Sequence, residues 1–129
     1  GTIPPGVSVP LHSHAEVEIF YVLEGAVEAF QYSDGSPTWT TVSAGDTVTI
    51  PGNTKHALRN SSPLPSTMVV VTTSKLYEFF QEVTKPFYPD QSATPPTPQG
   101  IEELLGIAAR YGYWMGSLAE NAAIGLNMG

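Results

Sequence analysis

Residues 6–25, GVSVPLHSHAEVEIFYVLEG, decide the fold, because they combine a glycine-bracketed strand pattern with two histidines and a carboxylate. A strand places alternate side chains on one face, so we expect His12 and His14 to point the same way. Glu18 has the same parity and lies in the β-branched and aromatic run of residues 16–23, which is typical of a strand. The stretch therefore predicts three potential metal ligands on one side of the chain.

The third histidine of the chain, His56, lies in a second stretch, residues 45–60, GDTVTIPGNTKHALRN. It follows the break at Pro51-Gly52, and an antiparallel barrel would bring its strand opposite His12 and His14. A lone histidine is more often a satisfied polar residue than a ligand, and a His-x-His pair alone is weak evidence. All three histidines lie in these two stretches, however, with a carboxylate at a workable offset. We therefore predict a metal centre.

The predicted centre has four ligands: His12, His14, Glu18 and His56. Three imidazoles and one carboxylate suit a single divalent ion of Fe, Mn, Ni, Co, Cu or Zn, and the sequence does not choose among them. Four protein ligands on a six-coordinate ion leave two positions for water, oxygen or substrate. Phe20 and Val22 share the parity of Glu18, and Leu58 and Asn60 share that of His56. These four residues are expected either to line a substrate pocket or to form ordinary core.

The rest of the first 73 residues reads as short strands separated by turns. We expect strands at residues 16–23, 26–32, 38–42, 47–50, 56–60 and 67–73, with a dense turn signal at residues 33–37. The prolines at 4, 5 and 10 exclude residues 1–11 from a central strand and leave a short edge strand around Val7 and Val9. The pattern predicts an all-β antiparallel sandwich or barrel.

The composition changes after Thr73, so we predict a barrel over residues 1–73 and a helical extension over residues 74–129 within one structural domain. Ser74 is expected to cap a helix at residues 75–83. A proline-rich connector at residues 84–99 precedes a second helix at residues 101–111, which Gly112 is placed to end. Residues 113–129 carry only a weak pattern.

Composition excludes several classes of protein. The 129 residues carry a net charge of −7, which disfavours nucleic acid and anionic membranes as partners. Cysteine is absent, which removes disulfides and thiolate ligands. No apolar run approaches the roughly 20 residues that a membrane span needs. With no secretory signal at its start, we expect the protein in the cytoplasm.

The two stretches resemble the two motifs of the cupin superfamily. Residues 6–25 match the first motif, G(X)5HXH(X)3,4E(X)6G, at every fixed position, and residues 45–60 resemble the second, G(X)5PXG(X)2H(X)3N. The second departs at Asn53, where the family has glycine, while Gly52 stands one place earlier. Asparagine tolerates positive φ, so we expect the turn to survive.

The resemblance implies a jelly-roll-like antiparallel β-barrel with the metal inside, near its open end, and with the two C-terminal helices packed outside. Cupin barrels usually have strands before the first motif, and only five residues precede Gly6 here. We expect either that a partner subunit supplies the missing edge, which would make a homodimer by sheet extension or strand exchange, or that the native N-terminus lies elsewhere.

The C-terminal segment carries a second resemblance, which bears on the expected activity. Residues 76–80, LYEFF, and 110–112, RYG, resemble the tail of single-domain cupins similar to quercetin 2,3-dioxygenase. This resemblance implies a metal-dependent dioxygenase that uses O₂ on a phenolic or enolic small molecule, with Glu18 as the catalytic base. A metal-dependent isomerase or lyase acting on a sugar or keto acid, and a non-catalytic ligand-binding cupin, are the alternatives. Glu16 is expected to be solvated.

Overall fold

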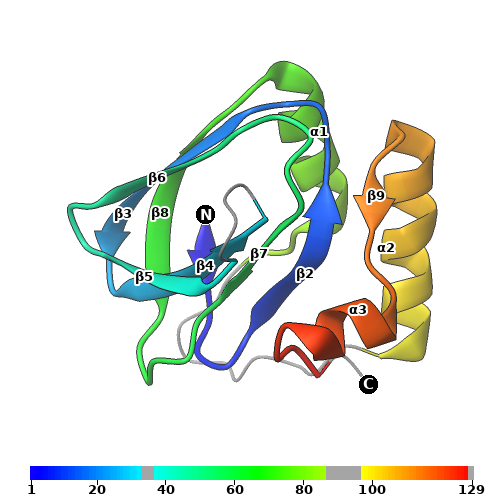
Figure 1. Cartoon of the computed structure of the whole chain (residues 1–129). Coiled ribbons are helices and arrows are strands. Elements are labelled where there is room, and N and C mark those ends of the chain that lie inside the picture. The colour runs from blue at the N-terminus through cyan, green and yellow to red at the C-terminus, as the bar shows by residue number, and fades with distance from the viewer. Residues whose placement is uncertain (33–36, 87–96, 128–129) are drawn as a thin grey trace.

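Two antiparallel sheets form the body of the molecule (Figure 1). The computed structural model describes residues 1–32, 37–86 and 97–127. The four-stranded sheet has the order β1 (Thr2–Ile3), β8 (Ser66–Val71), β3 (Glu18–Glu24), β6 (Thr47–Ile50). The five-stranded sheet has the order β5 (Trp39–Ser43), β4 (Ala26–Gln31), β7 (His56–Arg59), β2 (Ser8–Ser13), β9 (Trp114–Met115). The antiparallel all-β body predicted from the sequence is confirmed.

The main core lies between the two sheets, which do not close into one continuous barrel in the described part of the chain. The chain passes from one sheet to the other through Gly25, whose φ of 76° favours glycine. A Cβ there would lie 2.6 Å from the carbonyl oxygen of Pro65. The core consists of Ile3, Phe20, Val22, Val27, Ala29, Val42, Ile50, Leu58 and Met68.

The expectation for the first eleven residues is wrong in one respect. β2 contains Pro10, yet it lies between β7 and β9 rather than at an edge. The β2–β7 register is irregular between Val9 and His12, so the ladder is interrupted where proline has no N–H to donate. The turn predicted at residues 33–37 and the connector predicted at residues 84–99 fall mostly outside the described residues.

Three helices follow the strands: α1 (Ser74–Val83), α2 (Pro98–Tyr111) and α3 (Leu118–Ala123). The cap predicted at Ser74 is wrong, because Ser74 is the first helical residue and Thr73 holds the N-cap position without a side-chain bond. Gly112 ends α2 as predicted, in the left-handed conformation with a φ of 75°. β9 and α3 were not predicted, because residues 113–129 carry only a weak pattern. α3 begins with a capping box between Ser117 and Glu120.

The C-terminal segment contributes to two buried clusters, one within itself and one shared with the sheets. Leu76 of α1, Ala108 of α2 and the following Tyr113 form one buried cluster together with Phe79. Leu126 joins a second cluster with residues of β2, β4 and β7. The described helices are all too short, or too polar, to cross a membrane.

Candidate metal centre

His12, His14, Glu18 and His56 come together, as predicted, with one potential ligand atom from each lying within 4.8 Å of the others. His12 is on β2, His14 follows that strand directly, His56 begins β7, and Glu18 begins β3 in the opposite sheet. His14, Glu18 and His56 are buried. Trans ligands at metal bonds of about 2.1 Å would lie about 4.2 Å apart, so the cluster has the dimensions of a coordination sphere.

All three imidazoles are held in the same way at the nitrogen that faces away from the cluster. Nδ1 of His12 lies 2.7 Å from the carbonyl oxygen of Pro10, that of His14 lies 2.9 Å from Glu16 O, and that of His56 lies 2.7 Å from Thr54 O. A carbonyl only accepts, so each Nδ1 carries a proton and Nε2 is the nitrogen that faces the cluster. This is the tautomer that ligates a metal through Nε2.

The carboxylate of Glu18 lies between two of these nitrogens. Its Oε1 is 2.7 Å from Nε2 of His14 and 3.0 Å from Nε2 of His56. Nε2 of His14 is buried and has no hydrogen-bond partner in the described part of the chain, despite this short separation. Two imidazole nitrogens this close to one buried carboxylate oxygen are what a metal would satisfy, so the donor set fits a divalent cation.

In the metal-free cluster, burial and the neighbouring groups shift the pKa values of His12, Glu18 and His14 in different directions. Burial and the neighbouring His56 lower the pKa of His12 to about 3. Burial also disfavours the charged form of Glu18, but hydrogen bonds with His14 and His56 prevail and lower its pKa to about 2. For His14 burial acts downward, whereas the hydrogen bond and charge of Glu18 raise the pKa above its ordinary value. Glu18 is therefore ionised and His12 neutral at pH 7, as ligation requires.

We expect the metal-free protein to lose stability in mild acid. The unfolded chain protonates His12 near 6.5 and the folded chain only near 3, so protons favour unfolding as the pH falls through that window. Glu18 acts in the same direction between about 4.5 and 2, while the contribution of His14 is already complete below 6.5. Urea unfolding at pH 7, 6 and 5 measures this slope. A His12→Gln variant should flatten it, and an equal slope in that variant would contradict the assignment.

The departure from the second motif has a structural reason. Asn53 adopts a φ of 58°, the positive value expected for it, and its N–H donates to the carbonyl oxygen of His14 over 2.7 Å. A Cβ on Gly52 would lie 2.3 Å from the carbonyl oxygen of Ala15. Residues 52–53 therefore need one position without a side chain and one that accepts positive φ, and together they hold the loop that carries His14.

Gly52 is not a metal ligand, but replacing it with alanine should disturb the metal centre. The new methyl group would push the backbone at Ala15 away, which we expect to cost about 1–3 kcal/mol of unfolding free energy and to weaken metal binding. The matched change Asn53→Gly restores the glycine of the motif and should alter stability by less than about 1 kcal/mol. Urea unfolding and metal titration of both variants measure this, and equal behaviour of the two would contradict the explanation.

The structure places the four predicted pocket residues in different surroundings. Phe20, Val22 and Leu58 pack in the core between the sheets. The side-chain amide of Asn60 donates to the carbonyl oxygens of Ile3 and Leu64, and its Oδ1 accepts from Ser62. Their role as substrate contacts stays a prediction.

Two residues beside the centre were not identified from the sequence. Glu16 was expected to be solvated, which is wrong, because its side chain is 10% exposed and Oε2 lies 3.8 Å from Nδ1 of His14. Glu16 shares the parity of His14 and Glu18, and this signal could have placed it beside them, although residues 14–17 connect the two sheets and do not form a strand. Tyr113, from the weakly patterned tail, packs its ring 5.5 Å from that of His14.

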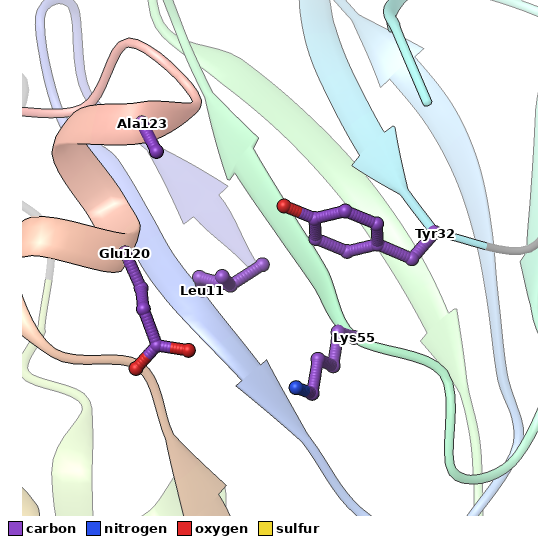
Figure 2. Close-up of a pocket in the computed structure, with 5 residues that line it drawn as sticks. All are labelled: Leu11, Tyr32, Lys55, Glu120 and Ala123. Carbon is purple, nitrogen blue, oxygen red and sulfur yellow. The ribbon is translucent and has the colours of Figure 1, made fainter. Parts of the chain in front are cut away.

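A cavity of about 430 Å³ lies away from the metal ligands, lined by Leu11, Tyr32, Lys55, Glu120 and Ala123 (Figure 2). Leu11 and Lys55 directly precede His12 and His56 in sequence. Alternation along β2 sends Leu11 to the face opposite His12, where it packs with Leu126. None of the four clustered ligands lines this cavity, so we do not assign it to the metal chemistry.

The two facing sheets form a β-sandwich of cupin type, with a His₃Glu cluster that could hold a metal ion. The family model described as "Cupin domain" matches residues 1–72, and the chain belongs to this family. No curated protein matches the chain.

Three solved structures illustrate the similarity. The protein TT1209 from Thermus thermophilus is 26% identical, with a TM-score of 0.50 over 56% of this chain and 66% of that one. The DMSP lyase DddQ from Ruegeria pomeroyi is 27% identical, with a TM-score of 0.50 over 70% and 42%. A predicted oxalate decarboxylase from Thermotoga maritima is 28% identical, with a TM-score of 0.49 over 55% and 59%. The chain thus spans between 42% and 66% of the length of these proteins.

Proposed function

We propose that this protein is a metal-dependent oxygenase of quercetinase type, which uses O₂ to cleave a small phenolic or enolic molecule. The proposal rests on the metal-ligand cluster and on one further observation, the aromatic residues that the C-terminal segment brings to it.

The aromatic residues form a continuous group beside the ligands. The Tyr113 ring lies 5.5 Å from the His14 ring, and Phe79 and Tyr111 lie 5.0 and 5.6 Å from Tyr113. Phe79 and Tyr111 belong to the two tail segments that resemble those of quercetinase-like cupins. Aromatic walls beside a polar centre favour a flat, apolar substrate with a few oxygen substituents. This packing of the tail against His14 is the observation that carries the proposal.

Each residue then has a stated role. His12, His14 and His56 would hold the ion through Nε2, each fixed by a backbone carbonyl at Nδ1. The ion supplies Lewis-acid polarisation of the substrate hydroxyl and access for O₂ at the same centre. Glu18 accepts the hydroxyl proton at its carboxylate, since the chain has no fourth histidine for this task. The aromatic group orients the substrate and excludes water.

A lyase is the second candidate, because DddQ, described as a DMSP lyase, is similar over 70% of this chain. Elimination needs a base and a polarising cation but no O₂, and the same residues would serve. A sugar-phosphate isomerase is less favoured, because the cations near the motifs are engaged. Arg59 pairs with Glu28 over 3.0 Å, and Lys55 lies 4.2 Å from the Trp114 ring centroid.

Oxygen consumption tests the proposal. Protein reconstituted separately with Fe, Mn, Co, Ni or Cu is mixed with a panel of flavonols and enediols in an oxygen electrode, beside metal-free protein. Uptake of O₂ with loss of flavonol absorbance, dependent on the metal, is the expected result. Turnover of DMSP or a related substrate under argon would overturn the oxygenase in favour of the lyase. Tight ligand binding without turnover would point to a non-catalytic cupin.

The homodimer predicted from the sequence stays a proposal. The four-stranded sheet exposes apolar side chains from two adjacent strands, namely Ile19, Tyr21, Leu23, Val69 and Val71. Contiguous exposed apolar surface commonly marks association. Light scattering during size-exclusion chromatography, with Tyr21→Ser as the disrupting variant, distinguishes a dimer from a monomer.

A further inference from the structure

Two buried polar atoms beside the metal centre are unexplained by the ligand set. Oε2 of Glu16 and the hydroxyl of Tyr113 are both inaccessible to solvent and have no hydrogen bond of standard geometry among residues 1–32, 37–86 and 97–127. Buried polar groups without partners are rare in folded proteins, and each one calls for a specific reason. Nε2 of His14, the other such atom in that part of the chain, is accounted for by metal ligation.

The backbone brings Tyr113 to His14 by strand pairing. β9 pairs antiparallel with β2, with His12 opposite Met115 and Ser13 opposite Trp114. Continuing that register by one residue sets Tyr113 opposite His14. The left-handed Gly112 ends α2 at this point, and the N–H of Tyr113 donates to the carbonyl oxygen of Ala108 over 2.9 Å. The tyrosine is therefore placed by the helix end as well as by the strand.

Both the backbone carbonyl and the side-chain carboxylate of Glu16 lie beside His14. Its backbone carbonyl accepts from Nδ1 of His14 over 2.9 Å, and its Oε2 lies 3.8 Å from that nitrogen. Burial, the charge of Glu16 and hydrogen bonding with its side chain all raise the pKa of Tyr113, so the phenol lies near this carboxylate. The imidazole edge of His14, the carboxylate and the phenol thus form one buried polar group, of which only the imidazole is a metal ligand.

We propose that Glu16 and Tyr113 are a coupled pair of positioning residues for His14: the Tyr113 hydroxyl donates to the Glu16 carboxylate and keeps it against Nδ1. A carboxylate at that edge fixes the ring orientation and makes Nε2 a stronger donor to the metal. Neither residue is a metal ligand, and both act on the metal through His14. This inference rests on the metal binding in the proposed function, and it names the residues that tune the affinity.

A double-mutant cycle on metal affinity tests the coupling. Co(II) dissociation constants are measured by chelator competition on the full chain for wild type, Glu16→Gln, Tyr113→Phe and the double variant. Loss of an outer partner typically costs 10–100-fold, so we expect Glu16→Gln to bind about 10-fold more weakly or worse. Tyr113→Phe should lose less, and the double variant should bind no more weakly than Glu16→Gln alone. Exposed Glu24→Gln and Tyr77→Phe are the matched controls and should bind as wild type does.

Two further readouts separate positioning from a general structural role. The visible absorption of bound Co(II) should shift in Glu16→Gln and Tyr113→Phe but not in the controls. Urea unfolding of metal-free Tyr113→Phe should show a loss of no more than about 1–3 kcal/mol, the cost of leaving the Glu16 carboxylate without this donor, so the variant stays folded and its metal affinity can be compared.

The outcomes are distinguishable. If wild type binds Co(II) and the two losses are absent or simply multiply in the double variant, the coupled pair is overturned and the metal centre stands. If wild type fails to bind Co(II), Mn(II) and Fe(II), the proposed function fails and the inference fails with it.

Discussion

Replacing His56 with alanine is expected to abolish stoichiometric metal binding. Its Nε2 lies 3.0 Å from Oε1 of Glu18, and its ring centroid lies 4.1 Å from that of His12, so its loss opens one side of the cluster. Loss of an outer partner costs roughly 10–100-fold in affinity, and loss of a ligand should exceed this. Elemental analysis of protein purified without chelator, together with a Co(II) titration, measures the effect.

Lys55→Ala is the matched control for this change. It alters the preceding residue, whose ammonium lies 4.2 Å from the Trp114 ring centroid and away from the ligands. The control should retain one ion per chain. A His56→Ala protein that is folded and binds metal as tightly as Lys55→Ala does would remove His56 from the centre.

Leu58→Ala is expected to lower the free energy of unfolding by about 2–5 kcal/mol, because the side chain is 4% exposed and packs in the core between the sheets. Metal affinity should change little, although Leu58 is only two residues beyond His56 on β7. Urea unfolding with the metal-free and metal-loaded protein gives both quantities. The experiment thus decides whether Leu58 acts in the core or in a substrate pocket.

Leu64→Ala makes the same chemical change at a side chain that is 65% exposed, and it should alter stability by less than about 0.5 kcal/mol. If Leu58→Ala instead costs under about 1 kcal/mol and raises the KM of a substrate, Leu58 belongs to the pocket predicted from its parity with His56.

The metal ligands could be predicted because short-range sequence patterns determine their placement. Alternation set His12 beside His14, and the glycine and proline positions of the two motifs set where β3 and β7 begin. Thr47–Ile50 was predicted with its exact bounds, because the turns on both sides carry strong signals. The tolerance of Asn53 for positive φ was predicted from its side chain alone and is confirmed.

The residues around the ligands could not be predicted, because long-range packing places them. Glu16 lies in a connection between the sheets, where packing determines its burial, and Tyr113 reaches His14 only through the pairing of β9 with β2. A strand of two residues has no periodicity to detect. The position of Pro10 in an inner strand was not predicted, because the structure accommodates this proline with a register irregularity that has no recognisable pattern in the sequence.

X-ray absorption at the metal edge tests the central claim most directly. A one-to-one complex of the full chain with Co(II) or Mn(II) is measured, and the nearest-shell distances and the scattering from imidazole rings are fitted. We expect nitrogen and oxygen neighbours at about 2.0–2.2 Å and the signature of three imidazoles per ion. A shell of oxygen alone, or one with fewer than two imidazoles, would contradict a centre built from His12, His14, Glu18 and His56.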